Sequence, residues 1–202
     1  MRSSLRLANP AGFLCVLALF LFLPLVAVSC DTADQTGNKH HGTIEATYTG
    51  TALLRNETTV KPTGEFSGEP DQNTRIYRPI SKIGTPTRCL AVATTVLLLA
   101  GAATTLIRAP RARTRAALAL AATALVCVVL TQIAATHHLR AVIERDFTPW
   151  MTELDGVAPL LRRSDEVVRV RMGYPATAIP LAAIVGLNTF TMIRRRKATT
   201  RS

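Results

Sequence analysis

Residues 116–135, AALALAATALVCVVLTQIAA, contain no Asp, Glu, Lys, Arg or His, and they decide the fold class. At a rise of 1.5 Å per residue, about twenty apolar residues form a helix that crosses a hydrocarbon core about 30 Å thick. Three further stretches of similar length also lack charged residues and histidine: residues 11–29, 89–107 and 174–193. The sequence therefore predicts a mainly α-helical membrane protein with four transmembrane helices.

The charge distribution predicts how these helices are oriented. The net charge of +11 comes from three acid-free segments, residues 1–10, 108–115 and 194–202, whereas segments 30–88 and 136–173 each carry equal numbers of basic and acidic side chains. Basic flanks stay in the cytoplasm, so we expect a multi-pass protein of the cell (plasma) membrane with both termini cytoplasmic. No aromatic residues interleave these short arginine clusters, so the lipid bilayer is an expected partner and nucleic acid is not.

The two neutral segments predict an extracytoplasmic subdomain of mixed α and β structure. In segment 30–88, residues 43–49 alternate, with Ile44, Ala46 and Tyr48 on one face, which predicts a strand in a small sheet of two or three strands. A mostly disordered loop is the alternative. We expect segment 136–173 to be helical, because the third helix continues without Gly or Pro to Phe147 and Ser164 is a suitable N-cap for the fourth.

The first apolar stretch has a second interpretation. It follows two arginines and resembles a signal peptide, and its end, AVSC at residues 27–30, resembles a bacterial lipobox in which Cys30 is acylated after cleavage. Cys30 and Cys89 are also predicted at the outer ends of the first and second spans, on the oxidising side of the membrane. We therefore expect a Cys30–Cys89 disulfide, with lipidation of Cys30 and free thiols as the alternatives. Cys15 and Cys127 are expected to be small apolar side chains within the spans.

Few residues suggest chemistry. Polar side chains inside the spans are expected to form hydrogen bonds between helices, with Gln132 and Asn188 near a shared interface. They also include Thr104, Thr105, Thr131 and Thr189. The lone tryptophan, Trp150, suits an anchor at the membrane interface. The histidine pairs at His40, His41, His137 and His138 are weak candidates for metal ligands, because adjacent histidines on a helix point about 100° apart. We predict no catalytic residue, no cofactor and no bound metal.

Three short motifs resemble those of a group of small, uncharacterised multi-pass membrane proteins of actinobacteria. They are FLPLVAVSC at residues 22–30, TYTGTALL at residues 47–54 and RMGY at residues 171–174. The resemblance implies a location and an architecture, and no activity. The leading hypothesis is a non-enzymatic membrane protein of the cell envelope whose outer domain binds an envelope or membrane partner. An accessory subunit of a transporter or channel is the alternative, and a metal-dependent envelope enzyme is the third.

Overall fold

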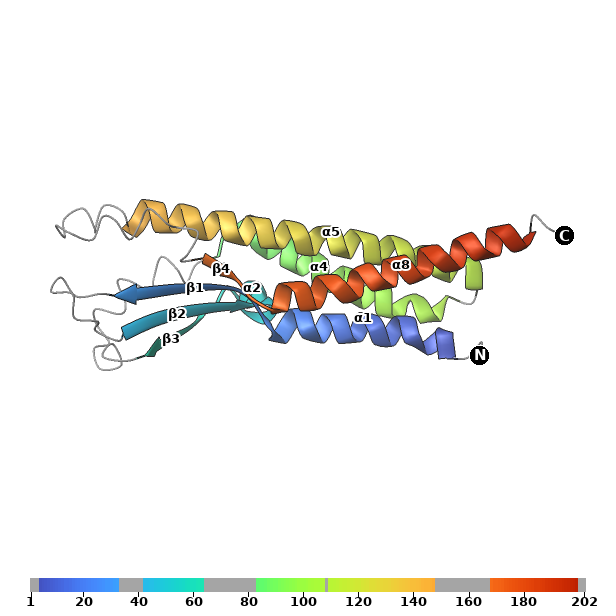
Figure 1. Ribbon diagram of the computed structural model, residues 1–202, viewed down its shortest axis with the longest axis horizontal. Helices are drawn as coiled ribbons and strands as arrows, with labels where there is room; N and C mark the ends of the chain where they lie inside the picture. Colours follow the sequence, from blue (N-terminus) through green and yellow to red (C-terminus); the bar gives the residue numbers. More distant parts are fainter. Residues whose placement is uncertain (1–3, 33–41, 64–82, 108, 148–167, 200–202) are drawn as a thin grey trace.

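The computed structural model describes residues 4–32, 42–63, 83–107, 109–147 and 168–199. A bundle of long helices dominates this part of the chain: α1 (Ser4–Phe22), α4 (Thr85–Ala103), α5 (Pro110–Val142) and α8 (Gly173–Thr199). A small β-sheet stands at one end of the bundle, and α1 begins and α8 ends at the other (Figure 1). We call these the sheet end and the basic end, the latter after the arginines that lie there: Arg111, Arg113, Arg115 and Arg194.

The helices are those of a membrane protein. Three are long and apolar enough to span a bilayer, namely Thr85–Ala103, Pro110–Arg145 and Gly173–Arg194. The apolar part of α1, Asn9–Phe22, is shorter than these, although α1 packs against α4 and α8. The mainly helical fold with helices of membrane-spanning length is therefore confirmed and is consistent with a membrane protein, whereas the predicted count of four spans is not confirmed.

The first predicted span, residues 11–29, is wrong in its second half. Helix α1 ends at Phe22, and strand β1 (Pro24–Thr32) follows after Leu23 alone. Pro24 explains the break, because proline disfavours a helical conformation in the residue before it. Residues 25–28 are all buried, which shows that both faces of this strand are covered. A strand covered on both faces has a continuous apolar sequence, and such a sequence also fits a membrane helix.

The sheet contains four antiparallel strands in the order β3-β2-β1-β4. The alternation at residues 43–49 forms β2 (Gly42–Thr49), with Ala46 and Tyr48 buried as predicted. Helix α2 (Gly50–Arg55) follows β2 directly and leads to β3 (Thr59–Thr63). The central strand β1 and the edge strand β4 (Val168–Val170) come from sequences that we predicted to be helical.

Strand β4 therefore corrects the predicted start of the fourth helix. Val168 pairs with Val28 and Val170 with Val26, and α8 begins only at Gly173, after two intervening residues. Residues 148–167, which include the predicted N-cap Ser164, lie outside the described residues.

Helix α5 extends beyond the membrane-spanning length, as predicted. Its 33 residues measure about 50 Å at the helical rise. A π-helical turn (Ile143–Phe147) continues it, and this end of α5 lies beside the sheet (Figure 1).

Candidate functional site

The sheet joins the bundle where two glycines allow backbones to approach closely. A Cβ atom added at Gly50 would lie 2.4 Å from the carbonyl oxygen of Phe20, and one added at Gly173 would lie 2.4 Å from that of Pro24. Real Cβ atoms essentially never come closer than 3.0 Å to another heavy atom, so a larger residue at either position requires the backbone to shift. We call this region, formed by residues 20–26, 48–53 and 171–174, the sheet–bundle junction. It brings together the three motifs that were quoted separately from the sequence.

Polar contacts also hold the sheet–bundle junction. The Thr51 hydroxyl donates a hydrogen bond to the carbonyl oxygen of Leu21, at 3.2 Å. The Arg171 backbone N–H donates to the carbonyl oxygen of Leu25 at 3.0 Å, and the Arg171 guanidinium forms an ion pair with Glu45 of β2. Both charged side chains are more than a third exposed, so the ion pair adds little stability. Together, the backbone hydrogen bond and the ion pair of Arg171 connect the segment just before α8 to the two neighbouring strands β1 and β2.

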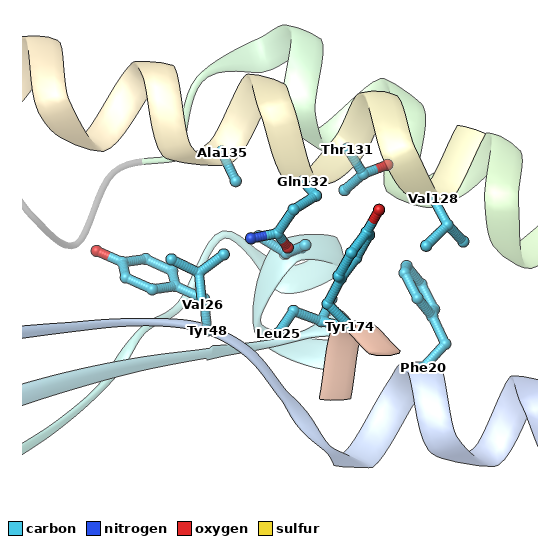
Figure 2. A pocket seen from close by; sticks show the side chains of 10 residues that line it. Phe20, Leu25, Val26, Tyr48, Val128, Thr131, Gln132, Ala135 and Tyr174 are labelled. Carbon is cyan, nitrogen blue, oxygen red and sulfur yellow. The ribbon is translucent and has the colours of Figure 1, made fainter. Parts of the chain in front are cut away.

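A small cavity lies inside the sheet–bundle junction. Its volume is about 10 Å³, close to the minimum that holds one water molecule. Figure 2 shows Gln132 reaching from α5 towards the strands at this cavity. The Gln132 Nε2 atom is buried and has no hydrogen-bond partner within the described part of the chain. The cavity is lined by Phe20, Leu25, Val26, Tyr48, Leu53, Val128, Thr131, Gln132, Ala135 and Tyr174.

Among the sheet residues whose side chains the structure describes, Tyr48 has a clearly shifted pKa. Its side chain is 2% exposed, and burial raises the pKa of its hydroxyl well above the usual value. A hydrogen bond with the Thr58 side chain opposes this increase in pKa without cancelling it. Tyr48 therefore remains neutral and acts as a core residue that links β2 to the segment before β3.

No family model, curated protein or solved structure matches this chain. The inferences below therefore rest on the contacts of its own residues.

Most of the described threonines that were predicted to bond between helices form their hydrogen bonds within their own helix instead. The hydroxyls of Thr131 and Thr189 donate to carbonyl oxygens four residues earlier in their own helices, and that of Thr104 donates to Gly101. These bonds satisfy the hydroxyl groups within single helices and do not connect neighbouring ones. The side chain of Thr105 lies outside the described ones.

Asn188 does connect two helices, through a residue that the sequence analysis missed. The Asn9 amide of α1 donates to Asn188 Oδ1 of α8 at 3.2 Å, while Asn188 Nδ2 donates to the carbonyl oxygen of Ile184. Asn9 precedes the predicted first span, residues 11–29, and was therefore not considered as a membrane residue. The sequence does offer a signal, because the apolar part of α1 runs from Asn9 to Phe22 and therefore includes Asn9 in a bundle helix.

Gln132 and Asn188 do not share an interface, contrary to the prediction. Gln132 lines the cavity at the sheet–bundle junction together with Tyr174, near the start of α8. Asn188 lies fourteen residues further along α8, about 21 Å towards the basic end. The transporter or channel alternative was based on Gln132 and Asn188 lying near one helix interface, and the structure does not bring these two side chains together.

The histidines form no metal site in the described residues. Residues 40 and 41 lie outside those residues, and no group of three or more His, Cys, Asp or Glu side chains suited to a metal occurs within them. His137 is exposed on α5. His138 packs against Gly84, where an added Cβ atom would lie 3.1 Å from its Nδ1 atom.

The structure does not support the predicted Cys30–Cys89 disulfide. Cys89 is an exposed free thiol in the first turns of α4. The prediction assumed that Cys30 lies where the first helix leaves the membrane, whereas it follows the end of α1 by eight residues of mostly extended chain, about 26 Å. Cys15 and Cys127 are also free thiols, on α1 and α5. The predicted interface anchor, Trp150, lies outside the described residues.

Proposed function

We propose that this protein is a non-enzymatic integral membrane protein that presents a rigid extracytoplasmic platform to an envelope or membrane protein. The observation that carries the proposal is the joint between the sheet and the bundle. Strand β1 follows α1 after one residue, and α8 follows β4 after two. Gly50 and Gly173 allow close backbone contact at this joint. A sheet held in this way has a fixed position relative to the membrane, and a fixed docking surface orders fewer groups when it binds a partner.

In the proposed orientation the basic end is cytoplasmic, the sheet end is outside, and α1 is a fourth span. The positive-inside rule supports this direction, since Arg111 and Arg194 lie at one end and every acidic residue of the described chain lies at the other. The burial of Phe13, Val16 and Phe20 within the bundle supports a spanning α1.

Thiol labelling of intact cells tests this orientation. In a background without native cysteines, a cysteine at the exposed position Ala112 should be protected from an impermeant reagent, and one at the exposed position Glu57 should be labelled. The two positions are matched in exposure and lie at opposite ends of the bundle. The reverse labelling pattern would invert the proposed topology.

We also propose that the first helix is retained in the mature protein. Cleavage before Cys30 would remove the part of β1 that pairs with both β2 and β4, including the fully buried Val26 and Ala27. The sheet would then lose its central connection. The intact mass of the purified protein distinguishes retention from cleavage and acylation, and an acylated protein that begins at Cys30 would refute it.

The most suitable partner-binding edge in the described sheet is β4. It is an edge strand, and an edge strand presents unpaired backbone groups to another chain. Arg169 and Val170 are exposed on it, so the edge offers a charge beside an apolar side chain.

In-cell photocrosslinking tests the partner proposal. A photoreactive residue at Val170 should give a discrete protein adduct, whereas one at Leu187, which is similarly exposed on the membrane part of α8, should not. The Arg169→Glu variant should lower the yield of the adduct while leaving the amount of folded protein unchanged. Identical adducts at both positions, or none at Val170, would contradict a docking role for this edge.

A further inference from the structure

One face of α5 combines two arginines with a long apolar surface. Successive residues of an α-helix turn by about 100°, which places positions 111, 115, 119, 126, 130 and 133 within an arc of about 100°. All six are exposed, including the large side chains of Val126, Leu130 and Ile133. Arg111 and Arg115 thus lie at the basic end of the same face that presents apolar side chains along the membrane.

Within the described residues, the two arginines have no acidic partner at their own end of the molecule. Every acidic residue in the described part of the chain lies at the sheet end: Asp31, Glu45, Glu57, Glu144 and Asp146. Arg111 and Arg115 are about 6 Å apart along the helix axis. Arginine binds phosphate through several N–H groups at once, and two arginines at this spacing are able to hold one phosphate group between them.

We propose that this face of α5 binds an anionic phospholipid. Its phosphate lies between Arg111 and Arg115, and one acyl chain runs along Ala119 towards Val126, which is as far as one leaflet of the hydrocarbon core, about 15 Å deep, extends from the headgroup level. Two features favour a lipid over a soluble anion or an acidic protein. The exposed apolar face continues directly from the charged pair, and Ala119, the first apolar position beyond it on this face, carries only a methyl group. This proposal concerns the basic end and does not depend on the proposed function of the sheet.

Arg113 provides a matched control within the same helix. It carries the same charge at the same end, but it lies about 200° around the helix from Arg111 and is half-buried. A diffuse attraction between the basic end and anionic lipid would be weakened equally by the loss of any of the three charges. A site on one face is weakened only by the loss of Arg111 or Arg115.

Binding of fluorescent phosphatidylglycerol to the purified full-length protein in neutral detergent tests the proposal. Phosphatidylcholine with the same acyl chains is the comparison lipid. We expect Arg111→Gln and Arg115→Gln each to weaken binding of phosphatidylglycerol about 5-fold, and the double variant about 25-fold. Arg113→Gln should change binding less than 2-fold, because we place its charge outside the site. In the unmodified protein, added salt should weaken binding of phosphatidylglycerol and leave phosphatidylcholine unaffected.

Three results would overturn the proposal. Equal losses in Arg113→Gln and Arg115→Gln would show a diffuse charge effect. Equal affinity of the unmodified protein for the two lipids would remove the role of the arginines. Displacement of phosphatidylglycerol by an equal concentration of inorganic phosphate would assign the site to a free anion. If one of the two site variants does not fold, as judged by size-exclusion chromatography, the comparison of the other with Arg113→Gln still separates a site from a diffuse charge effect.

Discussion

The substitution Gly173→Ala should destabilise the protein by driving α8 and β1 apart. The added Cβ atom would lie 2.4 Å from the Pro24 carbonyl oxygen and 2.8 Å from its carbon, and both are backbone atoms that no side-chain rotation can move away. Ordinary contact begins at 3.4 Å, so the two elements must separate by about 1 Å. Forcing an extra methyl group into a packed site costs about 1–3 kcal/mol. A loss of about 2 kcal/mol lowers the melting temperature of a chain of this size by about 4–8 °C.

Gly186→Ala is the control, because it adds the same methyl group to the same helix. A Cβ atom at Gly186 meets nothing within 4 Å, and replacing glycine inside a helix gains up to about 1 kcal/mol of helix propensity. Thermal unfolding of both variants in detergent, followed by the loss of the monodisperse elution peak, gives the comparison. We expect the Gly186→Ala variant to be at least as stable as the unmodified protein. If Gly173→Ala is equally stable, close packing of α8 on β1 does not hold the sheet–bundle junction together.

Three further predictions concern the bundle, the thiols and the sheet. In a double-mutant cycle, Asn9→Leu and Asn188→Leu should have a coupling free energy of unfolding of about 0.6 kcal/mol, and at most about 1.7 kcal/mol. Strictly additive effects would argue against a hydrogen bond between the two side chains. Cys89 should react with an alkylating reagent without prior reduction, and Cys89→Ser should leave the melting temperature unchanged. If alkylation of Cys89 required a reductant, the thiol would be oxidised and the disulfide prediction would be supported. Because burial raises the pKa of Tyr48, the unfolded chain loses this proton first as pH rises, so stability should fall above about pH 10. Melting temperatures of Tyr48→Phe across that range should fall less steeply than those of the unmodified protein, and parallel curves would count against burial of the hydroxyl.

The sequence predicts the long helices well because their signal is local. A run without charges, such as residues 116–135, has to be helical if it lies in lipid, since only a helix satisfies its own backbone groups there. The alternation that ends at Tyr48 is also local, and it predicts the buried face of β2 correctly.

The first strand is different because its apolar character has two explanations. Residues 25–28 are buried on both faces of a sheet, so they do not alternate and are equally suited to a membrane helix. Pro24 is the deciding residue, because a proline either kinks a membrane helix or ends it: the predicted first span continued as a helix to residue 29, whereas α1 ends at Phe22. The misplacement of Cys30, and with it the predicted disulfide, follows from that single error.

The sheet–bundle junction could not be predicted because its residues are far apart in the sequence. Gly50 and Gly173 are ordinary glycines until the structure places each of them on the backbone at the end of α1. Likewise, Asn9 acquires its role only from Asn188, which lies 179 residues away. Gly50 and Gly173 lie in two of the three short motifs quoted from the sequence, but only tertiary contacts show that these motifs meet.

Because only Leu23 separates α1 from β1, the first helix and the sheet should move together. The apolar part of α1 spans 14 residues, about 21 Å, against a hydrocarbon core of about 30 Å. In the proposed topology, where α1 is a fourth span, this mismatch is relieved if the bilayer thins beside α1 or if α1 is drawn further into it. Any such movement is transmitted through Leu23 to β1 without a flexible linker to absorb it. In the proposed topology, local bilayer thickness should therefore change the position of the sheet relative to the membrane.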